Sequence, residues 1–263
     1  MSQTGFRLFY GYLVVYAGLF FFGLGCLIWS GMAVLLFPLL SEKQGKAVGR
    51  SVTTYGFRFY LWCLTLTGCF RFDLRGLDAL RDAGPLIIAP NHPCLLDAVM
   101  VLSRLPDVAC VMKANLIDNP LFGASARLAR YIRNDSFFGA PKEAVKTLQA
   151  GSQLLLFPEG TRTTRLPVNR LKGGAALVSK RSGAPIQTVL IETDTPFLSK
   201  GWPLLRIPQL PITFRVRLGR RFLPRENLRE TLAELEAYYA SELSRRKEAG
   251  AVGSVLAQPQ NFG

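Results

Sequence analysis

Residues 86–97 read Leu-Ile-Ile-Ala-Pro-Asn-His-Pro-Cys-Leu-Leu-Asp, and this stretch decides the fold of the larger part of the chain. Its first four residues form a short apolar run between two prolines, which is typical of a buried strand. Pro93 suits the first turn of a helix, so the strand is predicted to pass directly into a helix. His92 then lies at the entrance of that helix, with Asp97 about one turn further in.

The chain beyond residue 70 repeats this alternation of short apolar runs and helical patterns. The predicted strands are Pro85–Pro90, Val108–Met112, Gln153–Phe157, Pro185–Glu192 and Ile212–Leu218. The predicted helices are Leu95–Leu105, Pro120–Arg130, Lys142–Ala150, Leu171–Arg181 and Glu226–Lys247. Strands that alternate with helices indicate an α/β core. The sequence contains no internal repeat and neither a G-x-G-x-x-G nor a P-loop pattern.

His92 is the only histidine of the chain, so chemistry that needs an imidazole has one candidate. The carboxylate of Asp97 is predicted to lie near enough to orient the ring, and a histidine oriented in this way is a general base. Such a base can take a proton from a hydroxyl that attacks a carbonyl. The alternative is that His92 is a turn residue and that Asp97 is an N-terminal helix charge favoured by the helix dipole.

A second polar motif follows a predicted strand at residues 157–162, which read Phe-Pro-Glu-Gly-Thr-Arg. Ligands of open α/β sheets usually bind at the carboxyl ends of the strands, where this turn lies. Arg162 offers a planar fork for a phosphate or carboxylate, and Lys172 precedes Gly173 and Gly174, whose bare backbone amides suit an anion. The alternative is a solvated basic turn.

The N-terminal segment is apolar and contains no charged residue between Arg7 and Glu42. As a helix, Leu13–Leu36 extends about 36 Å, which is enough to cross a hydrocarbon core. We expect one transmembrane helix, with a re-entrant hairpin, a buried helix and a cleaved signal peptide as alternatives. Positive charges follow the span more densely than they precede it, which places the bulk of the chain on the cytoplasmic face. The shorter run Phe57–Phe70 predicts an interfacial helix or a helix packed on the globular domain.

Composition narrows the function classes. The chain of 263 residues has 32 Lys and Arg against 18 Asp and Glu, a net charge of +14 that suits an anionic partner. The basic residues are scattered beside an apolar segment and no nucleic-acid module is recognisable, so nucleic acid is not expected as a partner. The five cysteines form no C-x-x-C pair, and neither a disulfide framework nor a metal site is predicted.

These motifs together resemble the lysophospholipid acyltransferase family, whose best-known members are the 1-acylglycerol-3-phosphate acyltransferases. The resemblance covers roughly residues 71–221. It rests on Asn91-His92 with Asp97, which match N-H-x-x-x-x-D, on residues 157–162, which match F-P-E-G-T-R without a change, and on the Lys172-Gly173-Gly174 segment before a helix. It implies a mixed sheet flanked by helices in a catalytic domain at residues 71–263, with residues 1–70 as a membrane-anchoring helical segment.

The resemblance also implies an activity in phospholipid biosynthesis. The family transfers a fatty acyl group from a thioester, acyl-CoA or acyl-carrier protein, to the hydroxyl of a lyso-lipid such as lysophosphatidic acid at a membrane, for a bacterial chain the inner membrane. His92 and Asp97 are then the catalytic pair, and neither a metal nor a cofactor is implied. The implied substrate-binding residues are Asn91, Arg133, Glu159, Gly160, Thr161, Arg162 and Lys172. The alternatives are a non-phosphate lipid acceptor, a thioester or lipid hydrolase, and a non-catalytic membrane scaffold.

Two elements depart from the family pattern. Where family members often read F-I-x-R, residues 131–134 read Tyr-Ile-Arg-Asn, so that Arg133 comes one place early. Where they read P-I-x-P, the chain has Thr188 in place of the second proline. Because both elements are associated with the acceptor side, the acceptor can differ from lysophosphatidic acid. The aromatic and basic segment Pro196–Pro211 predicts either contact with lipid headgroups or an ordinary packed loop.

Overall fold

The fold is built on one mixed sheet of seven strands in the order β1-β7-β6-β2-β5-β3-β4. The computed structural model describes residues 3–135, 139–203 and 206–256. The strands are β1 (Phe70–Asp73), β2 (Ile87–Pro90), β3 (Val108–Lys113), β4 (Ile132–Asn134), β5 (Gln153–Leu155), β6 (Ile186–Thr193) and β7 (Ile212–Phe222). Strands β2 to β6 run parallel, whereas β7 is antiparallel to β6 and parallel to β1. The predicted mixed α/β sheet is therefore confirmed.

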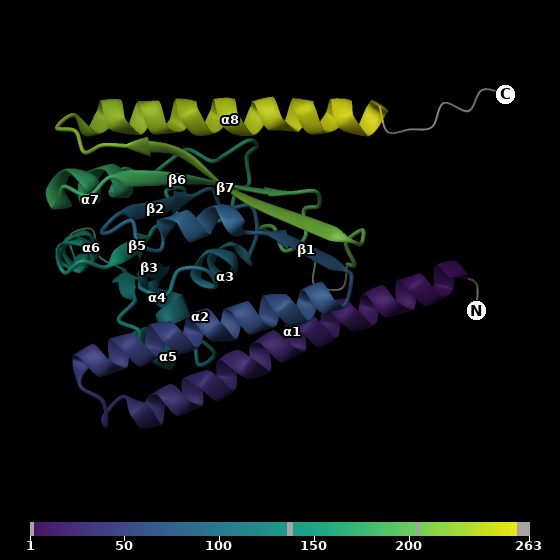
Figure 1. Cartoon of the computed structure of the whole chain (residues 1–263), viewed down its shortest axis with the longest axis horizontal. Helices are drawn as coiled ribbons and strands as arrows, with labels where there is room; N and C mark the ends of the chain where they lie inside the picture. The colour runs from purple at the N-terminus through teal and green to yellow at the C-terminus, as the bar shows by residue number, and fades with distance from the viewer. Residues whose placement is uncertain (1–2, 136–138, 204–205, 257–263) are drawn as a thin grey trace.

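Helices cover both faces of this sheet (Figure 1). They are α1 (Gln3–Leu36), α2 (Glu42–Leu66), the 3-10 helix η1 (Arg75–Leu80), α3 (Asp97–Leu102), α4 (Ala114–Ile117), α5 (Gly123–Leu128), α6 (Gly139–Gln149), α7 (Gly174–Ser182) and α8 (Leu228–Leu256). Helices α6, α7 and α8 share one apolar core with the sheet, and α1, α2 and α3 share the other. Figure 1 shows α8 above the sheet and the α1–α2 pair below it.

All five predicted strands are present, and the structure adds two at the two edges of the sheet, β1 and β4. Both are short, three or four residues, and mix polar with apolar side chains. They carry no continuous apolar run because only part of each strand is buried. Apolar runs in the sequence therefore predict the central strands of the sheet but not its two edge strands.

The helix expected at Phe57–Phe70 is longer and begins earlier. Helix α2 begins after Ser41, whose hydroxyl accepts from the backbone of Gln44 while the Gln44 side chain accepts from the Ser41 backbone. The chain leaves the helix near Gly68, whose φ of +71° is left-handed, and Phe70 already belongs to β1. Because the first half of α2 is polar, an apolar pattern could not predict where the helix begins. One side of the helix packs on the domain and the other is exposed, so features of both predicted alternatives are present.

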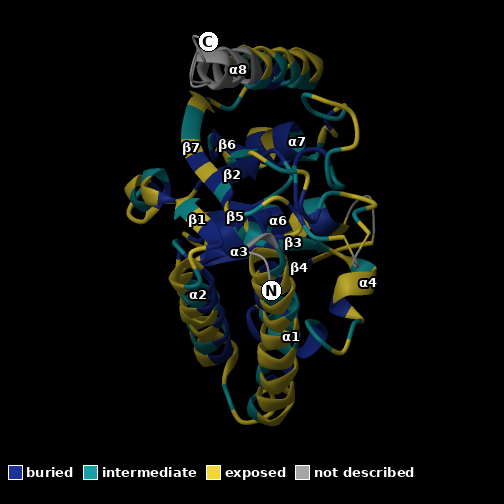
Figure 2. Cartoon of the chain, turned by 90° about the vertical axis from the view of Figure 1, so that its right-hand side faces the viewer, coloured by how far each residue is buried: buried dark blue, intermediate teal, exposed yellow. Residues whose placement is uncertain are grey.

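Helix α1 is long and apolar enough over Gly5–Leu36 to cross a membrane. Most of its large apolar side chains are exposed, and Figure 2 shows the exposed residues running along α1 and α2 while the sheet is buried. Examples are Phe6, Phe9, Phe20, Ile28 and Leu35. Because water would penalise this surface, the helix indicates membrane association.

Polar contacts fix α2 to the domain. Arg50 is 3% exposed, and its guanidinium donates to the Ala129 carbonyl at 3.1 Å, to the Ser152 hydroxyl at 3.1 Å and to the Asp107 carboxylate. Lys46 donates to the same Ser152 hydroxyl at 2.6 Å. Loss of these partners would leave a buried, uncompensated charge, which strongly destabilises a fold. The contacts of Arg50 therefore hold α2 firmly against the end of the sheet.

Two glycines of α2 give a matched test of this contact. A Cβ at Gly49 would lie 2.6 Å from the backbone nitrogen of Ala129, whereas a Cβ at Gly56 meets nothing within 4 Å. We expect Gly49→Ala to lower the free energy of unfolding by about 1–3 kcal/mol, because backbone must move to admit the methyl group. Gly56→Ala should be neutral or stabilising by up to about 1 kcal/mol. Thermal unfolding of both variants in one detergent checks this, and equal melting temperatures would contradict the close α2–α5 contact.

Candidate active site

The candidate site begins at the carboxyl end of β2. His92 lies two residues beyond Pro90, the last residue of β2, and its Nδ1 lies 2.7 Å from Oδ2 of Asp97. The His92 side chain is 18% exposed and that of Asp97 is 0% exposed, so the ring is reachable and its partner is not. The predicted pairing is therefore present. The predicted helix entrance at Pro93 is wrong, because residues 93–96 form a turn and α3 begins only at Asp97.

The buried carboxylate of Asp97 is held by two donors. The same Oδ2 that meets His92 accepts from the backbone N–H of Cys94 at 2.9 Å. Burial raises the pKa of Asp97, and the hydrogen bonds from His92 and Cys94 oppose that rise. A carboxylate without water around it gains more from a neighbouring positive charge than an exposed one. The arrangement thus holds the His92 ring against a buried carboxylate that fixes its orientation.

Cys94 lies within this motif, and the geometry excludes it as a nucleophile. Its side chain is fully buried, and the thiol sulfur accepts from the backbone N–H of Leu96 at 3.2 Å. Burial raises the pKa of the Cys94 thiol well above its ordinary value. Because the thiolate is the reactive form, this cysteine is inert.

Phe157 forms one wall of the site, a role that the motif match alone did not predict. Its ring stacks on the His92 ring with centroids 4.0 Å apart and an interplanar angle of 23°. The contact arises because β5, which precedes Phe157, pairs in parallel with β2. An apolar residue at the start of a polar turn was the available signal. Stacking and the Asp97 hydrogen bond together fix the plane of the imidazole.

Glu159 organises the site from within. It is 2% exposed, and its carboxylate accepts from the backbone N–H of His92 at 2.8 Å, from the Thr163 hydroxyl at 2.8 Å and from the backbone N–H of Asn169 at 2.9 Å. The Thr163 backbone N–H also donates to the His92 carbonyl at 2.6 Å. Both carboxylate oxygens of Glu159 thus accept from the protein itself, and its expected contact with substrate stays a prediction.

Asn91 also faces the protein. It is 4% exposed, and its amide donates to the Ile191 carbonyl at 2.9 Å and accepts from the Ile191 N–H at 2.7 Å. Both ends of the amide are thus used by the backbone of β6. Asn91 extends the pairing of β2 with β6 at the point where His92 leaves the sheet, which differs from the expected substrate contact.

Arg162 and Lys172 flank the turn as predicted. Nη1 of Arg162 donates to the carbonyls of Leu198 and Ser199 at 2.9 and 3.0 Å, so this arginine also holds the loop between β6 and β7. Gly160 has a φ of +67°, and a Cβ there would lie 2.9 Å from the Lys172 side chain, which therefore lies over the turn. Thr161 is half-buried beside them. The cluster places two positive charges at the turn whose Glu159 carboxylate accepts from the His92 backbone.

Arg133 is bound by acidic neighbours. It follows β3 in the sheet as part of edge strand β4, three strands from β2, or about 14 Å at the usual strand spacing. Its guanidinium donates to Asp118 at 2.5 Å and to Asp135. These carboxylates raise the pKa of Arg133 and offset its charge. The structure thus does not bring Arg133 together with the other predicted binding residues.

The loop held by Arg162 is partly packed. Phe197 and Leu198 are 3% and 4% exposed and belong to the core that contains α1 and α2. Trp202 is half-buried, and its ring lies under the Arg206 guanidinium at 5.1 Å from the centroid. The expectation of contact with lipid headgroups is therefore wrong for Phe197, which packs in the core as the packed-loop alternative predicts. Residues 204–205, which the same expectation included, lie outside the described residues.

Comparison with known proteins shows similarity to acyltransferases. Residues 71–192 match the family model described as Acyltransferase. The chain is 26% identical over 204 residues to a 1-acyl-sn-glycerol-3-phosphate acyltransferase of Pseudomonas aeruginosa, which covers 73% of this chain and 74% of that protein. It is 29% identical over 255 residues to human lysophosphatidylcholine acyltransferase 1, of which it spans 46% while 86% of this chain is covered.

A solved structure has the same fold. The crystal structure of the 1-acyl-sn-glycerophosphate acyltransferase PlsC from Thermotoga maritima superposes with a TM-score of 0.69 over 92% of this chain and 98% of that chain. The two sequences are 17% identical, so this likeness concerns the fold alone.

Proposed function

We propose that the chain, whose residues 71–192 match the acyltransferase family model, acylates the hydroxyl of a lyso-phospholipid at a membrane. The chain is an O-acyltransferase. The observation that carries the proposal is the 2.7 Å contact between His92 Nδ1 and buried Asp97, beside the basic turn of Arg162 and Lys172. We propose lysophosphatidic acid as the acceptor, because this turn suits a phosphate close to the reacting hydroxyl.

The proposed chemistry follows from the free nitrogen of the ring. Because Nδ1 faces Asp97, Nε2 is available to take the proton of the acceptor hydroxyl as its oxygen attacks the thioester carbonyl. The C–S bond then breaks, and the thiol of CoA or of the acyl-carrier protein leaves with the proton from the imidazolium. The donor carries its own activated carbonyl, so the proposed reaction uses neither a metal nor a cofactor.

The proposed location places the α1–α2 surface in or on the membrane and the sheet on its cytoplasmic side, in a bacterial chain at the inner membrane. The charge of +14 supports contact with an anionic leaflet and attraction of an anionic donor. Purified full-length protein incubated with labelled acyl-CoA or acyl-carrier protein and a panel of lyso-lipids tests the proposal. Free fatty acid as the main product would favour a hydrolase, and no turnover with any pair would contradict the activity.

Arg162 distinguishes phosphate from neutral acceptors. Its Nη1 is used by the Leu198–Ser199 backbone, and the rest of its planar fork is available to a phosphate. We expect Arg162→Lys to raise the KM for lysophosphatidic acid about tenfold, since hydrogen bonds to charged groups are among the stronger ones. The KM for the donor should stay unchanged.

The control for this prediction is Arg165→Lys, an exposed arginine of the same loop. Steady-state kinetics against lysophosphatidic acid and a matched neutral lyso-lipid make the comparison. Equal losses of kcat/KM on both acceptors would mean that Arg162 only supports the loop.

A further inference from the structure

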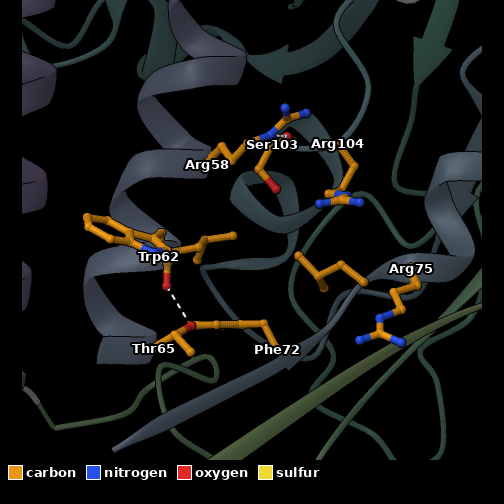
Figure 3. Close-up of a pocket in the computed structure, with 9 residues that line it drawn as sticks. Arg58, Trp62, Thr65, Phe72, Arg75, Ser103 and Arg104 are labelled. Atoms are coloured by element: carbon orange, nitrogen blue, oxygen red, sulfur yellow. Dashed lines mark hydrogen bonds between the residues drawn. The ribbon is translucent and has the colours of Figure 1, made fainter. Parts of the chain in front are cut away.

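A basic pocket lies on the flank of α2, away from the candidate active site. It has a volume of about 320 Å³, within the usual range for ligand pockets. Arg58, Arg75 and Arg104 line it together with Trp62 and Thr65. Figure 3 shows Arg58, Trp62 and Thr65 on α2 at one side of the space and Arg104 and Arg75 at the other.

The charges of this pocket are not balanced by the protein. Asp78 is the carboxylate beside it, and Asp78 already pairs with Arg104 and with Arg81 at 2.9 Å. Arg58 donates its Nε to the Ser103 carbonyl at 3.1 Å and has no carboxylate within ion-pair distance in the described part of the chain. Arg75 is exposed and likewise lacks an ion-pair partner among the described residues. The pocket therefore presents unpaired guanidinium groups that suit an anion with several oxygens.

The pocket lies beside β1, an edge strand of the sheet, whereas His92 follows the carboxyl end of the central strand β2. Strands β7 and β6 lie between β1 and β2. Arg104 follows α3, whose first residue is the Asp97 of the candidate site. The nine residues that line the pocket include none of the residues of the candidate active site.

The mouth of the pocket adjoins an apolar stripe. Five exposed side chains of α2 recur at intervals of three and four residues and so lie along one face. They are Val52, Tyr55, Phe59, Trp62 and Leu66, with exposures of 40%, 62%, 53%, 54% and 65%. Trp62 belongs to both this stripe and the pocket lining. Where the stripe meets lipid, the indole lies at headgroup level, and so do the guanidinium groups beside it.

We propose that this pocket binds the phosphate headgroup of an anionic phospholipid, as a second lipid site distinct from the one that reacts. The inference requires that α2 lie at the membrane, as proposed above, and does not require that the chain transfer acyl groups. The occupant is a lipid because the unpaired arginines and the apolar stripe meet at Trp62, so that a headgroup can enter the pocket while its chains stay on the stripe.

The experiment uses full-length protein in a neutral detergent. Substitution of Trp29 and Trp202 by phenylalanine leaves Trp62 as the only tryptophan, whose fluorescence reports on the pocket. Short-chain phosphatidylglycerol, short-chain phosphatidylcholine and inorganic phosphate are titrated separately. We expect saturable binding of phosphatidylglycerol, with weaker binding of both others. Equal affinity for the two lipids, or phosphate binding as tight as phosphatidylglycerol, would overturn the assignment.

Variants locate the binding. Arg75→Gln alone should weaken phosphatidylglycerol binding about fivefold, and the Arg58→Gln/Arg75→Gln pair should multiply two such losses. Because Arg75 has no described partner to lose, its variant tests the site without disturbing the fold. Arg181→Gln/Arg229→Gln removes the same charge from α7 and α8 on the other side of the sheet, and should leave binding unchanged.

Acyl transfer is measured on the same variants with a soluble acceptor. Turnover within about twofold of wild type, together with lost lipid binding, separates this pocket from the active site. A loss of binding in the control pair equal to that in the pocket pair would mean that only the overall charge acts, and would refute the pocket.

Discussion

Replacing His92 by alanine should lower kcat at least about a hundredfold, because removal of a general base costs roughly 10²–10⁴ in rate. The chain has no second histidine that could substitute. The loss should fall on kcat, since the ring contacts Asp97 and Phe157 and contributes little surface to substrate binding. Single-turnover acyl transfer with saturating donor and acceptor measures the chemical step.

Folding must be shown to survive this substitution. The His92 backbone, and not its ring, accepts and donates the hydrogen bonds that hold the Glu159 turn, so His92→Ala keeps them. The melting temperature in detergent should therefore stay close to that of wild type. A variant that retained more than about a tenth of wild-type turnover would show that His92 is not the base.

The second large effect is expected at Asp97, where two substitutions separate charge from orientation. In Asp97→Asn, the Cys94 N–H at the Oδ2 position favours the amide oxygen there, so the oxygen still meets Nδ1 of His92. The tautomer of the ring is then kept and the negative charge is lost. Asp97→Ala removes both. We expect a loss of about 10²-fold for the asparagine variant, in which only the charge is lost, and a larger one, up to about 10⁴-fold, for alanine.

The two Asp97 variants are compared in kcat at saturating substrates, with the melting temperature as a control for folding. The asparagine leaves its NH₂ at the buried Oδ1 position, which has no hydrogen-bond partner within the described chain. Some destabilisation is therefore expected in both variants. Wild-type turnover in Asp97→Asn would show that the charge does not contribute, and equal losses in both would show that orientation does not.

The sequence allowed the central part of the site to be predicted because it depends on local order. His92 and Asp97 are five residues apart, and a strand followed by a turn brings them together. The Glu159 turn could be placed at the same sheet edge because it too follows a buried strand. Its partner could not be predicted, since the contact with His92 depends on β5 lying beside β2.

The contacts of Asn91 and Arg133 could not be predicted from the motif match either. From its motif alone, Asn91 resembles a substrate ligand. Its two hydrogen bonds with the Ile191 backbone form only because β6 lies next to β2. Asp135 lies two residues from Arg133 in the sequence and pairs with it. This local signal was available, but a comparison of motifs does not consider it. Residues that match a family motif can therefore serve the scaffold, and pairing across the sheet decides which ones do.

The buried Arg50 has a consequence for how the molecule responds to its surroundings. Its guanidinium joins α2 to the Asp107 and Ser152 end of the sheet. We therefore expect the proposed membrane helix and the strand that carries His92 to move as one rigid unit, so that the depth of α2 in a bilayer would set the height of the candidate site above it.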